Sequence, residues 1–201
     1  MFGRLLTYVC RGRITLALLW LVASTYVPLV RSNPLATATA MDTDTVTAAI
    51  LLNIVRYTEW PATAQPPTAA APFVIGVSGN RPLLDALIRH VESQQVRSHP
   101  VYIVRLKNVD DLAACHLAFL NSKPDSDGMG VPIPAALKAL KGKPVLTVSF
   151  AEDFLAGGGL LQLYRVDSRL GFEIARETAR ATGLMLDSRV LIQSRPVPIQ
   201  P

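Results

Sequence analysis

Residues 143–194, KPVLTVSFAEDFLAGGGLLQLYRVDSRLGFEIARETARATGLMLDSRVLIQS, carry the densest folding signal in the chain. Val145 to Phe150 predicts a fully buried strand, because β-branched and apolar residues fill it with little polar alternation. The Gly157-Gly158-Gly159 turn follows, where the missing Cβ atoms allow positive φ and close approach of another backbone. We therefore expect this part of the chain to hold the centre of a sheet and a tight turn beside it.

An antiparallel hairpin and two short helices complete this region. The hairpin strands are Leu160 to Arg165 and Leu170 to Ile174. In the second strand, Phe172 belongs to the apolar face and is expected in the core, whereas Glu173 lies on the opposite face and is expected to be exposed. A helix over residues 175–182 ends at a glycine, and a final helix begins near Ser188.

Upstream, the pattern predicts alternating helices and strands. A helix from Thr45 to about Tyr57, capped by Asp42 or Asp44, ends before Trp60-Pro61. The remaining predicted elements are a strand over 73–78, a helix from Asn80 to about Glu92, strands over 101–106 and 116–120, a polar mobile loop over 121–134 and a helix over 135–140. This order predicts the α/β class: a single Rossmann-like three-layer domain with a mainly parallel sheet and the C-terminal antiparallel hairpin.

The first forty residues have the order of a secretory signal. A basic start is followed by an apolar run from Ile14 to Val30 and then by Ala36-Thr37-Ala38-Thr39-Ala40. We expect a signal peptide over 1–40, cleaved near residues 38–40, and a mature domain over 41–201 that is soluble and exported. An uncleaved membrane anchor is the alternative, since the apolar run lies at the short end of a membrane span of ~17–25 residues.

Charge and cysteine content exclude some classes of protein. Four of the 20 basic residues lie in the first forty residues, which hold no acidic residue, so the rest of the chain has 16 basic and 15 acidic residues and a net charge of +1. A net charge this close to zero lacks the excess of positive charge that nucleic-acid-binding proteins carry. The mature domain would keep Cys115 without a second cysteine, so its thiol is either buried or paired with another molecule.

No catalytic, cofactor or metal motif emerges from the residues. Cys115 and His116 are adjacent in a strand and should point to opposite faces, which does not suit a shared metal ion. Ser149 lacks the G-x-S-x-G context of a nucleophile. The glycine loop over 76–80 lies where α/β folds bind anions but lacks the nucleotide-binding spacings, and we interpret it as a tight turn. We expect a binding protein that is not an enzyme and needs no cofactor.

Two groups of residues are candidates for contact with a protein partner. Tyr57, Glu59 and Trp60 lie at a helix end beside a proline-rich loop, and tyrosine and tryptophan are frequent in interface hot spots. Trp60 filling the core is an equally weighted alternative. Gly158 and Gly159 leave a flat surface against which another backbone could lie, and Glu173 stands near them on the predicted hairpin.

Three motifs together resemble the YfiR/HmsC-like family of bacterial periplasmic proteins. They are ILLNIVRYTEWP at 50–61, SFAEDFLAGGGLLQLYRVDSRLGFEIA at 149–175 and ATGLMLDSRVLIQS at 181–194. Two departures are Ala175, where the family usually has asparagine, and Gln193-Ser194, where it usually has Leu-Ala. Relatives often carry a cysteine near Cys115 within a disulfide, for which this chain has no partner cysteine.

The resemblance implies a regulator that binds the periplasmic sensor region of an inner-membrane diguanylate cyclase. Repression of the cyclase would lower cyclic di-GMP and biofilm formation. A homodimer is possible, and contact with the membrane would occur only through the partner. The alternative function is a periplasmic small-ligand-binding protein with a pocket at the strand ends near Ser78 and Ser149.

Overall fold

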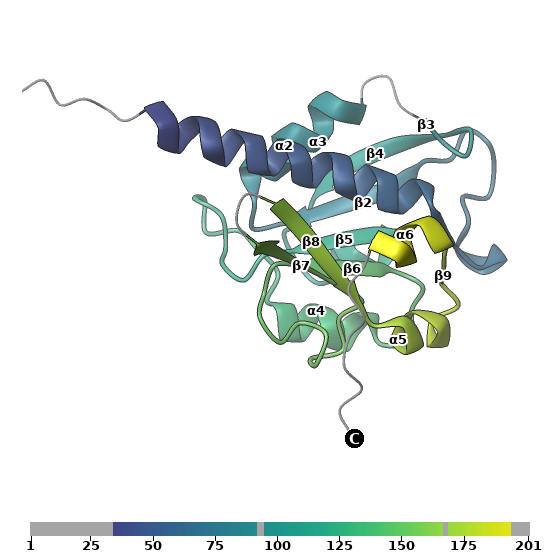
Figure 1. Cartoon of the computed structure of the whole chain (residues 1–201). Coiled ribbons are helices and arrows are strands. Elements are labelled where there is room, and N and C mark those ends of the chain that lie inside the picture. Colours follow the sequence, from purple (N-terminus) through teal and green to yellow (C-terminus); the bar gives the residue numbers. More distant parts are fainter. Residues whose placement is uncertain (1–33, 92–94, 167–168, 194–201) are drawn as a thin grey trace, which may run out of the picture. The chain divides into compact units, whose positions relative to one another are not determined.

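A seven-stranded sheet organises the fold in the computed structural model, which describes residues 34–91, 95–166 and 169–193 (Figure 1). The strand order is β3-β4-β2-β5-β6-β7-β8. The strands are β2 (Phe73–Ser78), β3 (Gln95–Val96), β4 (His99–Arg105), β5 (Leu117–Leu120), β6 (Leu146–Ser149), β7 (Leu161–Val166) and β8 (Arg169–Ile174). The five strands from β4 to β7 in this order pair in parallel, and β3 and β8 close the two edges in antiparallel pairing. The predicted parallel sheet with a terminal hairpin is confirmed.

Helices and two short strands surround the sheet. The helices are α2 (Pro34–Arg56), α3 (Arg81–Val91), α4 (Ile133–Leu140), α5 (Arg176–Ala181) and α6 (Ser188–Gln193), with 3₁₀ turns at η1 (Ala62–Ala64) and η2 (Asp110–Ala114). Strands β1 (Thr58–Glu59) and β9 (Met185–Leu186) pair with each other and connect the end of α2 to the C-terminal helices. None of the described helices is long and apolar enough to cross a membrane, and the apolar run Ile14–Val30 lies outside the described residues.

The sheet is covered on both faces, which makes the domain three-layered. In β5, Leu117 and Phe119 belong to the core shared with α2 and α3, whereas Ala118 and Leu120 belong to the core shared with α4. All four side chains are fully buried. Strands that are buried on both faces carry continuous apolar runs instead of alternation, which is the pattern that predicted them.

The start of the first helix differs from the prediction. We expected Asp42 or Asp44 to cap a helix at Thr45, but α2 already begins at Pro34. Asp44 instead lies within the helix and accepts a hydrogen bond from Asn80 Nδ2 at 3.4 Å. Asn80 in turn caps α3 as expected, because its Oδ1 accepts a hydrogen bond from the Leu83 amide at 3.0 Å.

Cys115 and His116 point to opposite faces of the sheet, as their adjacency in the sequence predicted. The Cys115 thiol is free and buried on the α4 side, where burial raises its pKa to about 11. Its sulfur lies close above Gly76, and a Cβ added there would come within 2.8 Å of it. The His116 ring lies on the other side, among aromatic rings. The sequence left two alternatives for this thiol, burial or pairing with another molecule, and the structure shows a buried thiol.

The His116 ring packs against the core on the α2 and α3 side. Its Nδ1 accepts a hydrogen bond from the Val74 amide at 3.0 Å, and its ring lies 4.7 Å from Phe73 and 6.0 Å from Trp60 between centroids. Burial lowers the pKa of His116 below its ordinary value of 6.5, and the nearby His99 lowers it further, against a backbone hydrogen bond at Ala64. Protonation would also remove the acceptor that holds the Val74 amide.

His116 should therefore make the domain less stable in mild acid. Because its pKa is lower in the folded state, the unfolded state binds more protons below pH 6.5, and the free energy of unfolding falls as the pH drops through that value. We expect His116→Gln to remove this slope between pH 6.5 and 5, measured by urea unfolding at several pH values. His90→Gln is the matched control and should keep the slope. Equal slopes in the wild type and His116→Gln would contradict the assignment.

Candidate functional site

An open groove lies where the C-terminal half of α2, strand β8 and helix α6 meet. We call it the α2–β8 groove. Its volume is about 400 Å³, and its lining includes Ile50, Asn53 and Tyr57 of α2, Leu170 and Phe172 of β8, and Arg189 of α6. Segments that are far apart in the sequence thus form one surface, next to the short β1–β9 pair.

The Tyr57 ring at the end of α2 forms one wall of this groove. The Arg189 guanidinium lies over the ring, 4.8 Å from its centroid, in cation–π geometry. Asp187 positions the arginine, since its Oδ1 lies 3.3 Å from Arg189 Nε and accepts the Arg189 amide at 2.8 Å. This backbone hydrogen bond and the charge of Arg189 lower the pKa of Asp187 below its ordinary value. The Asp187 amide donates to the Tyr57 carbonyl at 2.9 Å, which fixes α6 against the end of α2.

Trp60 does not share this surface. Its side chain is only 3% exposed and packs against Phe73, with the ring centroids 5.2 Å apart. Its carbonyl accepts a hydrogen bond from Gln65 Nε2 at 2.9 Å. The position of Trp60 therefore matches the alternative in which its side chain fills the core.

The two predicted acidic contacts lie in different surroundings. Glu59 is exposed on β1 and lies 3.3 Å from Arg97, an exposed ion pair of the kind that contributes little to stability. Glu173 lies on β8 opposite Gln162 of β7, and it is half-buried, whereas the sequence predicted an exposed side chain. On this face of the hairpin the Tyr164 ring of β7 lies over the neighbouring Gly171, so side chains of the hairpin itself cover part of the surface beside Glu173.

Strand β8 is the edge of the sheet. It pairs with β7 on one side, and no strand pairs with its other side in the ranges that the structure describes. Within the hairpin, Gly171 lies opposite Tyr164, and a Cβ at Gly171 would come within 2.5 Å of the tyrosine ring. The glycine therefore lets an aromatic side chain cover the strand where its own side chain is missing.

The two predicted glycines of the triple-glycine turn have different roles. Gly159 is buried, and a Cβ there would lie 2.3 Å from the Phe154 ring, so the glycine is needed for core packing. Gly158 is exposed, adopts a φ of +95° and has open space where a Cβ would be. It lines a second groove beside α4, away from Tyr57.

Tyr57 is the one predicted contact residue of the six that lines the α2–β8 groove in the described ranges. Glu173 follows the lining residue Phe172 in the sequence. Sequence reasoning missed Arg189 and Asn53 as groove residues. Their place depends on how α6 packs on α2, and no local pattern reports that contact. The cation–π geometry of Arg189 also requires the β1–β9 pairing that brings the two segments together.

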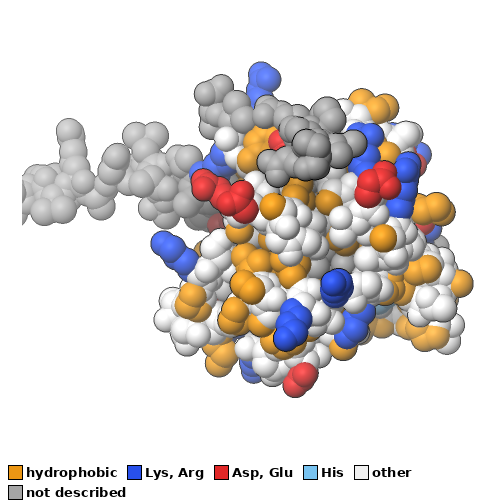
Figure 2. Space-filling model, turned by 90° about the horizontal axis from the view of Figure 1, so that it is seen from below, with side chains coloured by type: hydrophobic (Ala, Val, Ile, Leu, Met, Phe, Trp, Pro, Cys, Tyr) orange, Lys and Arg blue, Asp and Glu red, His pale blue; other side chains and the backbone are white. Residues whose placement is uncertain are grey.

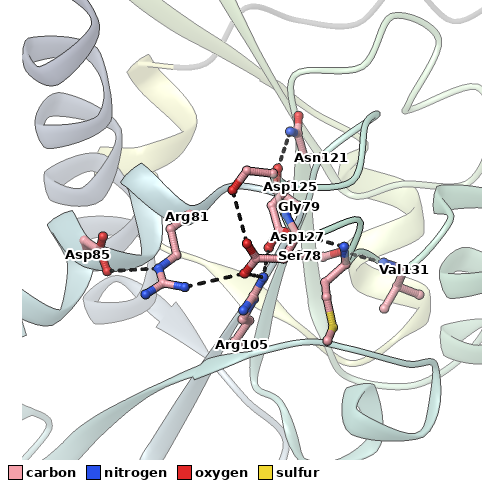
Figure 3. A network of polar contacts seen from close by, with 11 residues as sticks. Ser78, Gly79, Arg81, Asp85, Arg105, Asn121, Asp125, Asp127 and Val131 are labelled. Atoms are coloured by element: carbon pink, nitrogen blue, oxygen red, sulfur yellow. Dashed lines mark hydrogen bonds and ion pairs between the residues drawn. The ribbon is translucent and has the colours of Figure 1, made fainter. Parts of the chain in front are cut away.

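The ends of the central strands, where we expected a ligand pocket as the alternative, are filled by the chain itself (Figure 3). The Ser78 hydroxyl accepts a hydrogen bond from the Val131 amide at 2.7 Å. The Ser149 hydroxyl donates to the Leu120 carbonyl at 2.6 Å. Both serines are fully buried. Their hydroxyl groups therefore hold backbone in place and do not line an open pocket.

The segment 121–131 fills this space and is fixed by charged side chains. Asn121 Nδ2 donates to the Gly79 carbonyl at 2.6 Å, and the loop backbone leaves room only for a glycine at position 79. Arg105 at the end of β4 pairs with Asp125, whose side chain is 4% exposed, and lies 2.8 Å from the half-exposed Asp127. Burial alone would raise the pKa of Asp125, but its hydrogen bonds with Arg105 and two backbone amides lower it below its ordinary value. The sequence predicted this segment as a mobile loop.

The two aspartates offer a matched test of this polar network. Asp125→Asn removes the charge that faces Arg105 in a buried position, and we expect the melting temperature to fall by about five degrees or more. Asp127→Asn changes an exposed partner of the same arginine, and the expected fall is below about two degrees. Circular dichroism during heating measures both. Equal effects of the two substitutions would show that the buried pair does not fix the loop.

The architecture defines the class of the protein: a three-layer α/β domain with a surface groove at its sheet edge. The chain belongs to the YfiR/HmsC-like family, whose model matches residues 44–195. This match contains the whole sheet and both grooves. The family is associated with the periplasmic regulation of diguanylate cyclases.

Other comparisons add little. No curated protein matches the chain. Among solved structures, the chain is similar to an aspartate aminotransferase of subgroup IV from Thermus thermophilus, with 16% identity and a TM-score of 0.34. The match covers 80% of this chain and 52% of that one, so the chain spans about half the length of the enzyme. At this level of similarity the aminotransferase activity is a property of that enzyme alone.

Proposed function

We propose that the domain over 41–201 is an exported repressor that binds the periplasmic sensor region of an inner-membrane diguanylate cyclase and lowers cyclic di-GMP and biofilm formation. The observation that carries this proposal is the family match over residues 44–195. The repressor acts by binding and not as an enzyme, and it uses no cofactor.

The α2–β8 groove and the β8 edge support a contact with the sensor region. The groove combines apolar lining with Tyr57 and Arg189, and aromatic and arginine side chains are enriched in interface hot spots. The open edge of β8 offers backbone groups that an extended segment could pair with. In this proposal Tyr57, Glu59 and Glu173 contact the sensor, and the buried Trp60 and Gly159 hold the surface in shape, while Gly158 lies on the other groove.

Repression follows from unequal affinity for two states of the cyclase. A protein that binds the inactive state of the sensor more tightly shifts the equilibrium towards that state. A reversal from 99:1 to 1:99 needs about 5.5 kcal/mol of differential binding free energy. The small-ligand binder remains the alternative function, but of the two serines where its pocket was expected, Ser78 bonds the Val131 amide of segment 121–131 and Ser149 bonds the Leu120 carbonyl of β5.

A gene deletion combined with three substitutions tests the proposed repression. Deletion should raise cyclic di-GMP and surface attachment. Glu173→Lys should raise cyclic di-GMP at normal protein abundance, because it reverses a charge on the open edge strand β8, and Glu177→Lys on α5, whose side chain is 87% exposed, is the matched control that should not. Phe172→Ala truncates a side chain that is 6% exposed and should remove the protein itself, at a loss of about 3–5 kcal/mol of stability.

The readout for each strain is cyclic di-GMP together with the abundance of the protein in the periplasm. Abundance separates loss of contact from loss of fold, which matters because Glu173 is half-buried. Unchanged cyclic di-GMP in the full deletion, with a cyclase that has a periplasmic sensor expressed, would rule out repression and favour the small-ligand binder.

Release of the domain into the periplasm requires removal of the N-terminal segment, and we propose cleavage after Ala38 or Ala40. Mass spectrometry of the periplasmic fraction should then find a mature N-terminus near Met41. Ala38→Glu should block processing, because Ala38 belongs to both Ala-x-Ala patterns, whereas Thr37→Glu should be processed. An intact N-terminus recovered from the inner membrane in the wild type would establish the anchor instead.

A further inference from the structure

A second groove lies on the opposite face of the sheet, and we call it the α4 groove. Its volume is about 530 Å³. It extends from the end of α4 across the start of β6 to the triple-glycine turn and α5. Its floor is apolar and includes Leu137, Leu140, Val145 and Leu160. Leu140 and Val145 belong to the core on the α4 side, whereas the α2–β8 groove borders the other core, so the two grooves are separate surfaces.

Three lysines line the α4 groove: Lys138, Lys141 and Lys143. The chain has only two other lysines, Lys107 and Lys123, so this is where lysine side chains concentrate. All three are exposed, and none makes an ion pair with another residue of the described ranges. No carboxylate lines the groove. The groove is therefore a local concentration of positive charge on a domain that is close to neutral.

The surface around this groove shows the same distribution of charge. Figure 2 views the molecule from the side on which α4 and α5 lie in Figure 1. Hydrophobic and basic side chains occupy the middle of this face, and the acidic ones lie towards its margin. Glu177 of α5 is the acidic residue closest in sequence to the lining residue Thr178, and it already pairs with Arg180 at 3.3 Å.

The glycine turn leaves one wall of the groove without side chains. Gly157 and Gly158 line it, and a Cβ at Gly158 would meet nothing within 4 Å. The missing side chains allow the backbone of another chain to come close, and the exposed Thr178 stands on the far wall as a hydrogen-bonding group. An open groove with one bare wall fits a peptide segment better than a flat bilayer surface, which could not reach the apolar floor.

We propose that the α4 groove binds an acidic segment of a protein partner. Apolar side chains of that segment cover Leu137 and Val145, and its Asp or Glu side chains pair with the three lysines. The complementarity of charge and the apolar floor together specify the partner: a short stretch that carries leucine-like residues and carboxylates on the same face. This binding site is distinct from the α2–β8 groove, because the two grooves share no lining residue.

The test measures binding of a peptide to the mature domain over 41–201. The peptide is fluorescein-labelled and acetylated, and its leucine and glutamate side chains lie on the same face. Fluorescence anisotropy should show saturable binding that weakens as the salt concentration rises. The triple variant Lys138→Gln, Lys141→Gln, Lys143→Gln should weaken binding about tenfold or more, as expected for the loss of three exposed ion pairs. The variant Lys107→Gln, Lys123→Gln is the matched control and should bind like the wild type.

Two further outcomes decide against the proposal. Equal binding of the peptide to the triple variant and to the control variant would place the contact elsewhere. Binding to phosphatidylglycerol vesicles that the triple variant loses, without binding to the peptide, would assign the lysines to a lipid surface. A peptide with lysine in place of glutamate checks the sign of the charge, and it should not bind. Circular dichroism of each variant confirms that the fold is kept, so lost binding reports the groove.

Discussion

The structure depends on the burial of the central parallel strands on both faces. Phe119 and Leu146 on one side and Ala118 and Leu120 on the other are all without solvent exposure. A sheet of this kind is stable only when helices cover both faces, because each face exposes apolar side chains. The long helix α2 and helix α3 supply one cover, and α4 supplies the other. Both grooves lie beside these covering helices, one between α2, the edge strand β8 and α6, the other between α4, the triple-glycine turn and α5.

The same burial explains why the strand ends are closed. Strands β2 and β6 carry hydroxyl groups, Ser78 and Ser149, at fully buried ends, and a buried hydroxyl without a partner is unfavourable. Backbone from segment 121–131 and from Leu120 satisfies them. In many doubly wound domains this crevice receives a ligand. Here the chain supplies its own polar groups there, and the two grooves described above lie elsewhere, at the sheet edge and beside α4.

The sequence predicts the elements that carry a local signal. Strand Phe73–Ser78 and the C-terminal hairpin were expected within one or two residues, because apolar runs and turn residues mark them. The start of α2 at Pro34 was missed, since an alanine- and threonine-rich stretch has no cap that stands out from its neighbours. The β1–β9 pair was also missed, because a two-residue strand has no period and depends on a partner more than a hundred positions away.

The candidate site was harder to predict than the fold for a physical reason. Trp60 and Tyr57 are both aromatic residues at the same helix end, and one enters the core whereas the other lines a groove. The direction of each side chain is set by the sheet and by α6, which pack on the helix from elsewhere in the sequence. Glu173 shows the same limit. Strand alternation puts its side chain on the other face of β8 from Phe172, but how far the side chain is buried depends on the residues that pack beside the edge strand.

The proposed repression needs only a small part of an interface to distinguish two states of the partner. Two states of a partner lose the same translational and rotational freedom when they bind, so that cost cancels in the difference between their affinities. At ~25 cal/mol per Å² of apolar surface, a preference of ~5.5 kcal/mol corresponds to ~220 Å² of contact made with only one state. This is a small part of a standard interface of ~1,600 Å². In the proposed complex the groove could contribute part of this contact together with the open edge of β8, while the rest of the interface contributes equally to both states.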